Sequence, residues 1–179
     1  MPRIQPVTDP TPASRALLDQ VEQAFGGTPN LLATLGHSSA ALGSYLAFSG
    51  ALKDTSISGA LREQIALAVA GANGCEYCAS AHTLLARGQK VAESELSKNL
   101  EGVSDDPRTQ AALRFATQVV QKRGWVDDAE VSAVREAGFG DAEILEIIAT
   151  VSLNVFTNYV NHAVRTEVDF PRVEVPQPS

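Results

Sequence analysis

Apolar residues recur along most of this chain at the three-to-four-residue spacing of amphipathic helices. No stretch alternates β-branched and polar residues in the way that a half-buried strand requires. The pattern therefore predicts an all-α fold, with helices over about residues 14–25, 31–52, 58–72, 75–87, 92–100, 107–123, 127–137 and 141–168. The second of these helices is expected to break near Gly36.

Capping residues mark several of the expected helix ends. Ser58 has the position and chemistry of an N-cap, and Asp127 and Glu130 have capping-box spacing. Gly71 and Gly74 bracket a tight turn before residue 75. The Pro-rich segment 1–12 is typical of an extended arm, so we expect one domain over residues 1–179 with its core at about residues 14–171.

The last predicted helix is apolar on nearly every face. A small domain has difficulty covering such a helix alone, so part of it is expected to pack against other subunits. The sequence therefore predicts a homo-oligomer.

Composition and charge exclude several classes of partner. The 179 residues are 44% apolar and 20% charged, with a formal net charge of -7, which disfavours nucleic acid because phosphate binding needs clustered Lys and Arg. No apolar run approaches the roughly 20 residues that span a bilayer, and the first residues lack the apolar core of a signal peptide. We expect no membrane partner and a cytoplasmic location, where a close cysteine pair is more often catalytic or metal-binding than structural.

The segment NGCEYCASAH, residues 73–82, contains both cysteines of the chain and one of its three histidines. On a helix, Cys75, Cys78 and His82 fall on one face within an arc of roughly 60°. Two cysteines at i and i+3 can form a disulfide with little backbone movement. The N–H groups of a first helical turn favour thiolate, and Cys75 and Cys78 both lie at such a position.

Glu63 is the second unusual residue, because the helical segment that follows it, residues 65–72, is apolar on all sides. It lies too far from Ser58 to complete a capping box, so its carboxylate is expected to point into the protein and accept a proton. A thiol, an imidazole and a carboxyl group could thus form a relay.

This combination resembles the AhpD-like (alkylhydroperoxidase D) branch of the carboxymuconolactone decarboxylase family, in its peroxidase-related members. The matching elements are Glu63, the Cys75-Glu76-Tyr77-Cys78 motif twelve residues later, and His82, flanked by FGGTPNLLATLGHS and NVFTNYVNHAVRTEVDFP. The resemblance covers about residues 25–171.

The resemblance implies a trimer or hexamer that reduces hydroperoxides with a thiol reductant, without a cofactor or metal. Cys78 would be the peroxidatic cysteine, Cys75 would resolve the sulfenic acid as a disulfide, and Glu63 and His82 would relay protons. The best-known members carry a second His where this sequence has Tyr77.

Several alternatives compete with this interpretation. The cysteine pair could act as a redox sensor or disulfide-exchange module, or the chain could be a carboxymuconolactone decarboxylase-type enzyme. A small metalloprotein would need a fourth ligand beside Cys75, Cys78 and His82. His162 forms a polar stripe with Asn154, Asn158 and Asn161 that could line a subunit interface or border the active site.

Overall fold

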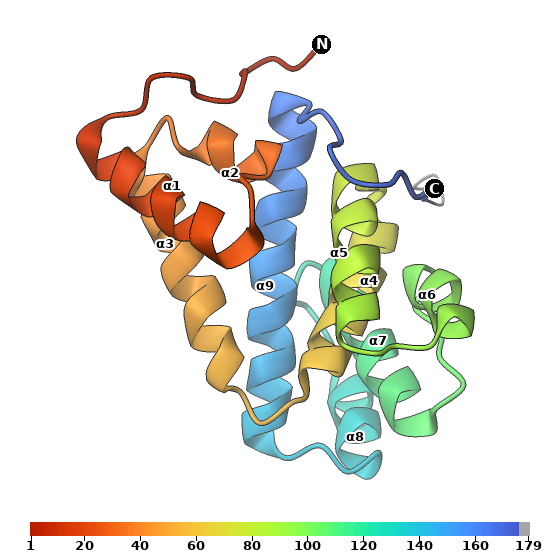
Figure 1. Cartoon of the computed structure of the whole chain (residues 1–179). Helices are drawn as coiled ribbons and strands as arrows, with labels where there is room; N and C mark the ends of the chain where they lie inside the picture. The colour runs from red at the N-terminus through yellow and green to blue at the C-terminus, as the bar shows by residue number, and fades with distance from the viewer. Residues whose placement is uncertain (176–179) are drawn as a thin grey trace.

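The computed structural model describes residues 1–175, and every regular element within them is helical (Figure 1). This confirms the predicted all-α class, and the break near Gly36 separates the second helix from the third. The elements are α1 (Pro12–Phe25), α2 (Asn30–Leu35), α3 (Ser39–Ala51), the 3-10 helix η1 (Leu52–Asp54), α4 (Gly59–Asn73), α5 (Glu76–Gly88), α6 (Glu93–Leu100), α7 (Pro107–Gln121), α8 (Asp128–Glu136) and α9 (Asp141–Val164).

Helices α4 and α9 organise the bundle. Figure 1 shows α9, in blue, running the length of the molecule, with α1 and α3 to one side and α4 and α5 to the other. Helix α4 packs against α5, α6, α7 and α9. Its residues Leu67 and Ala70 join the apolar cluster that contains both cysteines, whereas Ile65 and Val69 join a second cluster with α7 and α9. Burial on both sides explains why this stretch of α4 has no polar face.

Two glycines near the end of α4 have different roles. A Cβ at Gly71 would collide with the carbonyl oxygen of Leu100, so glycine permits the close approach of α4 and α6. Gly74 ends α4 with a φ of 65°, a left-handed conformation that glycine adopts without strain. The chain reverses there, and Cys75 becomes the N-cap of α5.

The expected caps are present elsewhere. The Ser58 side chain accepts the Leu61 N–H at the start of α4, and Asp127 and Glu130 form the predicted capping box of α8. These contacts satisfy N–H groups that a helix start leaves unpaired. Local sequence therefore sets both helix starts.

The last helix ends at Val164 and not at the predicted Val168. Arg165 adopts a left-handed conformation with a φ of 56°, and its N–H donates to the carbonyl oxygen of Asn161. The following C-terminal strap, residues 165–175, keeps an apolar pattern because Val168 and Phe170 pack on the cysteine-containing cluster. Helical periodicity alone could not distinguish this extended packing from another helical turn.

Helix α9 is buried on one side and bare on the other within this chain. Ile147 and Val151 are buried, whereas Leu145, Phe156 and Tyr159 are 66%, 40% and 60% exposed. None of the helices that the structure describes combines the length and the hydropathy needed to cross a bilayer.

Candidate active site

The two cysteines lie one helical turn apart as free, buried thiols. The Sγ of Cys75 accepts the backbone N–H of Cys78 at 3.3 Å, so this thiol caps α5. The Sγ of Cys78 accepts the side-chain amide Nδ2 of Asn161, on α9, at 3.2 Å. The neighbouring thiols therefore have different partners.

These surroundings shift the two thiol pKa values in opposite directions. Burial opposes ionisation of Cys78, but the hydrogen bond from Cys75, the charge of His82 and the amides of Asn161 and Asn158 lower its pKa to about 7. The pKa of Cys75 is raised, first by the hydrogen bond to Cys78 and then by burial. The helix start favours thiolate at both positions, but these contacts distinguish the two thiols: Cys75 keeps its own proton at a pH at which Cys78 ionises.

The predicted imidazole and carboxyl group form a pair behind Cys78. Nδ1 of His82, on α5, donates to Oε2 of Glu63, on α4, at 2.7 Å, and each side chain is 21% exposed. Burial lowers the pKa of His82, but the charge and hydrogen bond of Glu63, together with Cys78, raise it overall. An imidazolium held in this way stabilises the nearby thiolate and can supply a proton.

Asparagines of α9 complete the site, although their pattern in the sequence indicated only a polar stripe. Asn158 accepts a hydrogen bond from Nδ2 of Asn73 at 2.9 Å, and among the described residues its own Nδ2 has no partner within hydrogen-bond distance. That amide contributes to the lowered pKa of Cys78. The recurrence of Asn154, Asn158 and Asn161 on a mostly apolar helix was the signal available in the sequence. The stripe borders the cysteines, whereas His162 lies on the exposed side of α9.

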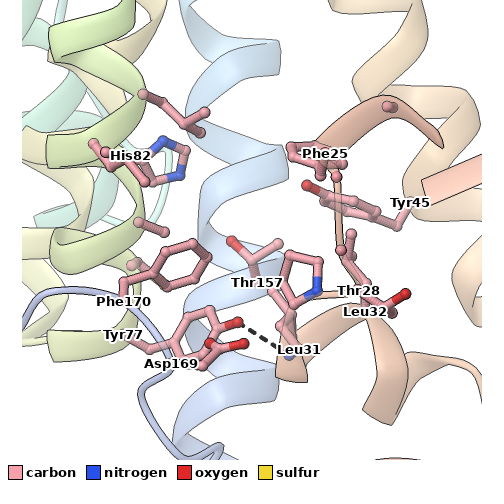
Figure 2. Close-up of a pocket in the computed structure, with 18 residues that line it drawn as sticks. Phe25, Thr28, Leu31, Leu32, Tyr45, Tyr77, His82, Thr157, Asp169 and Phe170 are labelled. Carbon is pink, nitrogen blue, oxygen red and sulfur yellow. Dashed lines mark hydrogen bonds between the residues drawn. The ribbon is translucent and has the colours of Figure 1, made fainter. Parts of the chain in front are cut away.

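A pocket of about 560 Å³ opens onto Cys78 and His82 (Figure 2). Most of its wall is apolar, with aromatic rings from α1, α3, α5 and the C-terminal strap: Phe25, Tyr45, Tyr77 and Phe170. Figure 2 shows His82 on one side of this space and Phe25 and Tyr45 on the other. The pocket volume is within the range of small-molecule sites.

Tyr77, which stands in place of the second His of the best-known relatives, makes structural contacts. Its hydroxyl oxygen accepts the Leu31 N–H at 3.1 Å, and its ring meets Phe170 edge-on with centroids 5.5 Å apart. Burial is the main cause of its raised pKa, so the phenol stays neutral. Tyr77 thus joins α5 to α2 and the strap.

Tyr45 is a further pocket residue that the sequence did not indicate. Its pKa is raised mainly by burial and also by the charges of Glu63 and Cys78, while a hydrogen bond with Ser49 opposes the shift. A neutral hydroxyl therefore faces the site from α3. Its position depends on packing between helices that are distant in sequence.

The chain has an all-α fold like that of AhpD-core proteins. Residues 40–118 match the carboxymuconolactone decarboxylase family. Together with the structural neighbours below, this match confirms the resemblance inferred from the sequence. No curated protein matches this sequence.

Three solved structures share the fold over nearly the whole chain. The AhpD-core peroxidase-related protein of Ralstonia eutropha JMP134 is 26% identical, with a TM-score of 0.82 and 93% of each chain covered. A peroxidase-related protein of Silicibacter sp. TM1040 is 22% identical, with a TM-score of 0.81 and 92% of this chain and 91% of that chain covered. The debrominase Bmp8, in a variant complexed with 2,3,4-tribromopyrrole, is 21% identical, with a TM-score of 0.79 and coverage of 93% and 91%.

Within residues 1–175, no three His, Cys, Asp or Glu side chains converge to hold a metal ion. Cys78 and His82 line the same pocket, whereas Cys75 is the extended N-cap of α5, and each of the three is engaged in the hydrogen bonds described above.

Proposed function

We propose that this protein is a thiol-dependent peroxidase that reduces hydroperoxides through a dithiol and disulfide cycle of Cys78 and Cys75. The observation that carries the proposal is the asymmetry of the pair. Cys78 shares a pocket with His82 and accepts the Asn161 amide at 3.2 Å, whereas Cys75 accepts only a backbone N–H of its own helix. In keeping with these contacts, the pKa of Cys78 is lowered to about 7 while that of Cys75 is raised. About half of Cys78 is then thiolate at neutral pH, next to a thiol that still holds its proton.

The chemistry follows from these positions. The Cys78 thiolate attacks the terminal oxygen of the hydroperoxide, the O–O bond breaks, and sulfenic acid forms on Cys78. The alkoxide that leaves takes a proton from His82, whose charge is balanced by Glu63 at 2.7 Å. Cys75 then attacks the Cys78 sulfur, the S–O bond breaks, and water leaves as the disulfide forms. Two equivalents of a thiol restore the pair.

The comparisons support this proposal at the level of the family. The neighbour that is 26% identical is an AhpD-core, peroxidase-related protein. The apolar pocket suits a hydroperoxide with a hydrocarbon substituent, because apolar surface is removed from water when it binds.

Reductive removal of a halogen from an aromatic ring is a second candidate function. The aromatic wall of the pocket favours it, and the Bmp8 neighbour is a debrominase seen with a brominated pyrrole. The Cys78 thiolate would attack the bromine, the C–Br bond would break, and the ring carbon would take a proton. Cys75 would then attack the Cys78 sulfur and expel bromide, so that the dithiol supplies the two electrons and becomes the disulfide.

The deciding experiment is stopped-flow oxidation of the reduced protein by hydrogen peroxide, tert-butyl hydroperoxide and cumene hydroperoxide, followed by steady-state turnover with dithiothreitol. We expect Cys78 to react at least 100-fold faster than a free thiol, with sustained turnover. Oxidation at the rate of a free thiol would contradict the proposal.

The same assays separate the alternatives. Release of bromide from tribromopyrrole without peroxide turnover would favour the dehalogenase. A single oxidation without turnover would favour a sensor or disulfide-exchange module, and decarboxylation of a lactone by the Cys78→Ser variant would favour a carboxymuconolactone decarboxylase-type enzyme.

A further inference from the structure

The two cysteines line different cavities. Cys78 lines the apolar pocket of about 560 Å³, and Cys75 does not. Cys75 lines a second, shallower pocket of about 320 Å³ between the start of α5 and the end of α9. Its other polar lining residues are Glu76, Asn161, His162, Arg165 and Thr166.

We propose that the second pocket binds the reductant, and that this reductant is a small thiol bearing a carboxylate. The inference rests on the proposed function only for the origin of the disulfide. It assigns the hydroperoxide to one side of the cysteine pair and the reducing thiol to the other.

Thiol–disulfide exchange favours attack from this side. A thiolate that attacks the Cys75 sulfur forms a mixed disulfide there, breaks the S–S bond and expels Cys78 as thiolate. Cys78 is the better leaving group because its pKa is the lower of the two. A second thiol then attacks the reductant's sulfur, which releases the oxidised reductant and returns Cys75 as a thiol. Attack on Cys78 would instead expel the poorer leaving group.

The second pocket offers groups that recognise a polar ligand. Asn161 is 4% exposed, and its Oδ1 has no hydrogen-bond partner among the described residues. The Thr166 hydroxyl is buried and likewise unpartnered in that part of the chain. The Thr166 hydroxyl can donate to an oxygen of the ligand carboxylate, and the Asn161 Oδ1 can accept the S–H of the reductant or a water that enters with it.

The charge at the rim selects an anion. Glu76 is paired with Arg172 at 3.2 Å, which balances its negative charge. Arg165 is exposed, and within residues 1–175 its guanidinium forms no ion pair or hydrogen bond. A carboxylate can accept two parallel hydrogen bonds from an arginine, and His162 stands beside it on the rim.

The depth of Cys75 favours a small reductant. Cys75 is 1% exposed, so a thiol must enter the pocket to reach its sulfur. A pocket of about 320 Å³ is at the lower limit of small-molecule sites. A cysteine thiol on the broad surface of a protein reductant would not enter the pocket far enough to contact the Cys75 sulfur.

The test measures reduction of the disulfide by three thiols of similar size: anionic 3-mercaptopropionate, neutral 2-mercaptoethanol and cationic cysteamine. Diamide forms the disulfide, so the starting material does not depend on peroxidase activity. Rate constants are expressed per thiolate to remove differences in thiol pKa. We expect the anionic thiol to reduce the wild-type disulfide fastest. In the Arg165→Gln variant, the rate constant for this thiol should fall about ten-fold and that for the neutral thiol less than two-fold.

Arg123→Gln is the matched control, because Arg123 is also an exposed arginine in a left-handed conformation after a helix, with a φ of 54°. All three thiols should reduce the disulfide of this variant at the wild-type rates. A His162→Trp variant, which fills the rim, should slow reduction by all three thiols, whereas cumene hydroperoxide still reaches Cys78 through the other pocket.

Rapid alkylation during reduction locates the reductant. We expect peptide mapping to find the thiol on Cys75 and the alkyl label on Cys78. The reverse placement, or equal effects of Arg165→Gln and Arg123→Gln, would overturn the inference. Failure of hydroperoxide to form the disulfide, with normal charge-selective reduction of the diamide-oxidised protein, would overturn the peroxidase proposal alone.

Discussion

The Cys78 side and the Cys75 side of the α5 start differ although they are three residues apart. Cys78 faces an apolar pocket, lies near a paired imidazole and accepts an amide hydrogen bond from α9. Cys75 faces a polar pocket and accepts a backbone N–H of its own helix. Helix position alone would favour ionisation of both thiols. The difference comes from side-chain surroundings: the Cys75 hydrogen bond, the charge of His82 and the amides of α9 favour ionisation of Cys78, whereas the hydrogen bond to Cys78 and burial keep Cys75 protonated.

Cysteine substitutions should have the largest effect on peroxidase turnover, and they should separate the roles of Cys78 and Cys75. Cys78→Ser should abolish peroxidase turnover, with a loss of more than about 10³-fold, because the nucleophile is removed. Cys75→Ser should still undergo one oxidation per chain and accumulate sulfenic acid on Cys78. Trapping with dimedone and mass spectrometry distinguish the two variants. Sulfenic acid on Cys75 in the Cys78→Ser protein, with none on Cys78 in the Cys75→Ser protein, would show that Cys75 is the peroxidatic cysteine and Cys78 the resolving one.

Glu63→Gln should have the next largest effect. It removes the charge that raises the pKa of His82, so turnover should fall by about 10² to 10⁴-fold, the usual contribution of a positioned acid or base. Glu93→Gln is the control, because Glu93 forms an exposed ion pair with Arg87. Near wild-type turnover in Glu63→Gln would contradict a role of Glu63 in proton transfer and would show that it is a packing residue.

The pH profile of the same variant gives an independent readout. Thiolate on Cys78 forms above its pKa of about 7, while His82 holds its proton only below its own raised pKa. Wild-type kcat/KM should therefore rise near pH 7 and fall at higher pH. In Glu63→Gln the falling limb should move to lower pH, because a raised histidine pKa returns toward its ordinary value without the carboxylate.

Asn161→Ala should weaken the difference between the thiols to a smaller extent. Loss of the amide donor raises the pKa of Cys78, and a rise of about one unit lowers the thiolate fraction at pH 7 about five-fold. The pH dependence of alkylation by iodoacetamide measures this change. Asn161→Asp should shift the midpoint further, because it adds a negative charge. Two unchanged midpoints would show that Asn161 does not stabilise the thiolate.

The smallest effect on the thiols is expected from the bare side of α9. We propose that Leu145, Phe156 and Tyr159, exposed in one chain, pack between subunits of a homo-oligomer. Leu145→Glu should reduce the sedimentation coefficient and change alkylation of Cys78 less than two-fold, because the residues that set its pKa come from one chain. Gln121→Glu, on α7, is the control. A monomeric wild-type protein at micromolar concentration would contradict the oligomer.

The sequence predicted helix class, most helix starts and the break at Gly36, because caps, glycines and helical periodicity act over a few residues. It was less accurate at the end of α9, where the strap keeps an apolar pattern while it packs in extended form. It also placed Cys75, Cys78 and His82 on one face, because an i, i+3, i+7 spacing determines that on any helix. The pairing of His82 with Glu63 was expected mainly through resemblance to a known family.

What the sequence by itself determined was therefore the short-range part: which segments are helical, where Gly74 turns the chain, and which residues share the first two turns of α5. Only the tertiary structure decided the rest. It brought the Asn161 amide to Cys78 across 83 residues, set Tyr45 and Phe170 in the wall of one pocket, and placed the two cysteines in the walls of separate cavities. The physical reason is that burial, charge and hydrogen bonding at a thiol are sums over whatever packs against it, and those neighbours come from distant parts of the chain.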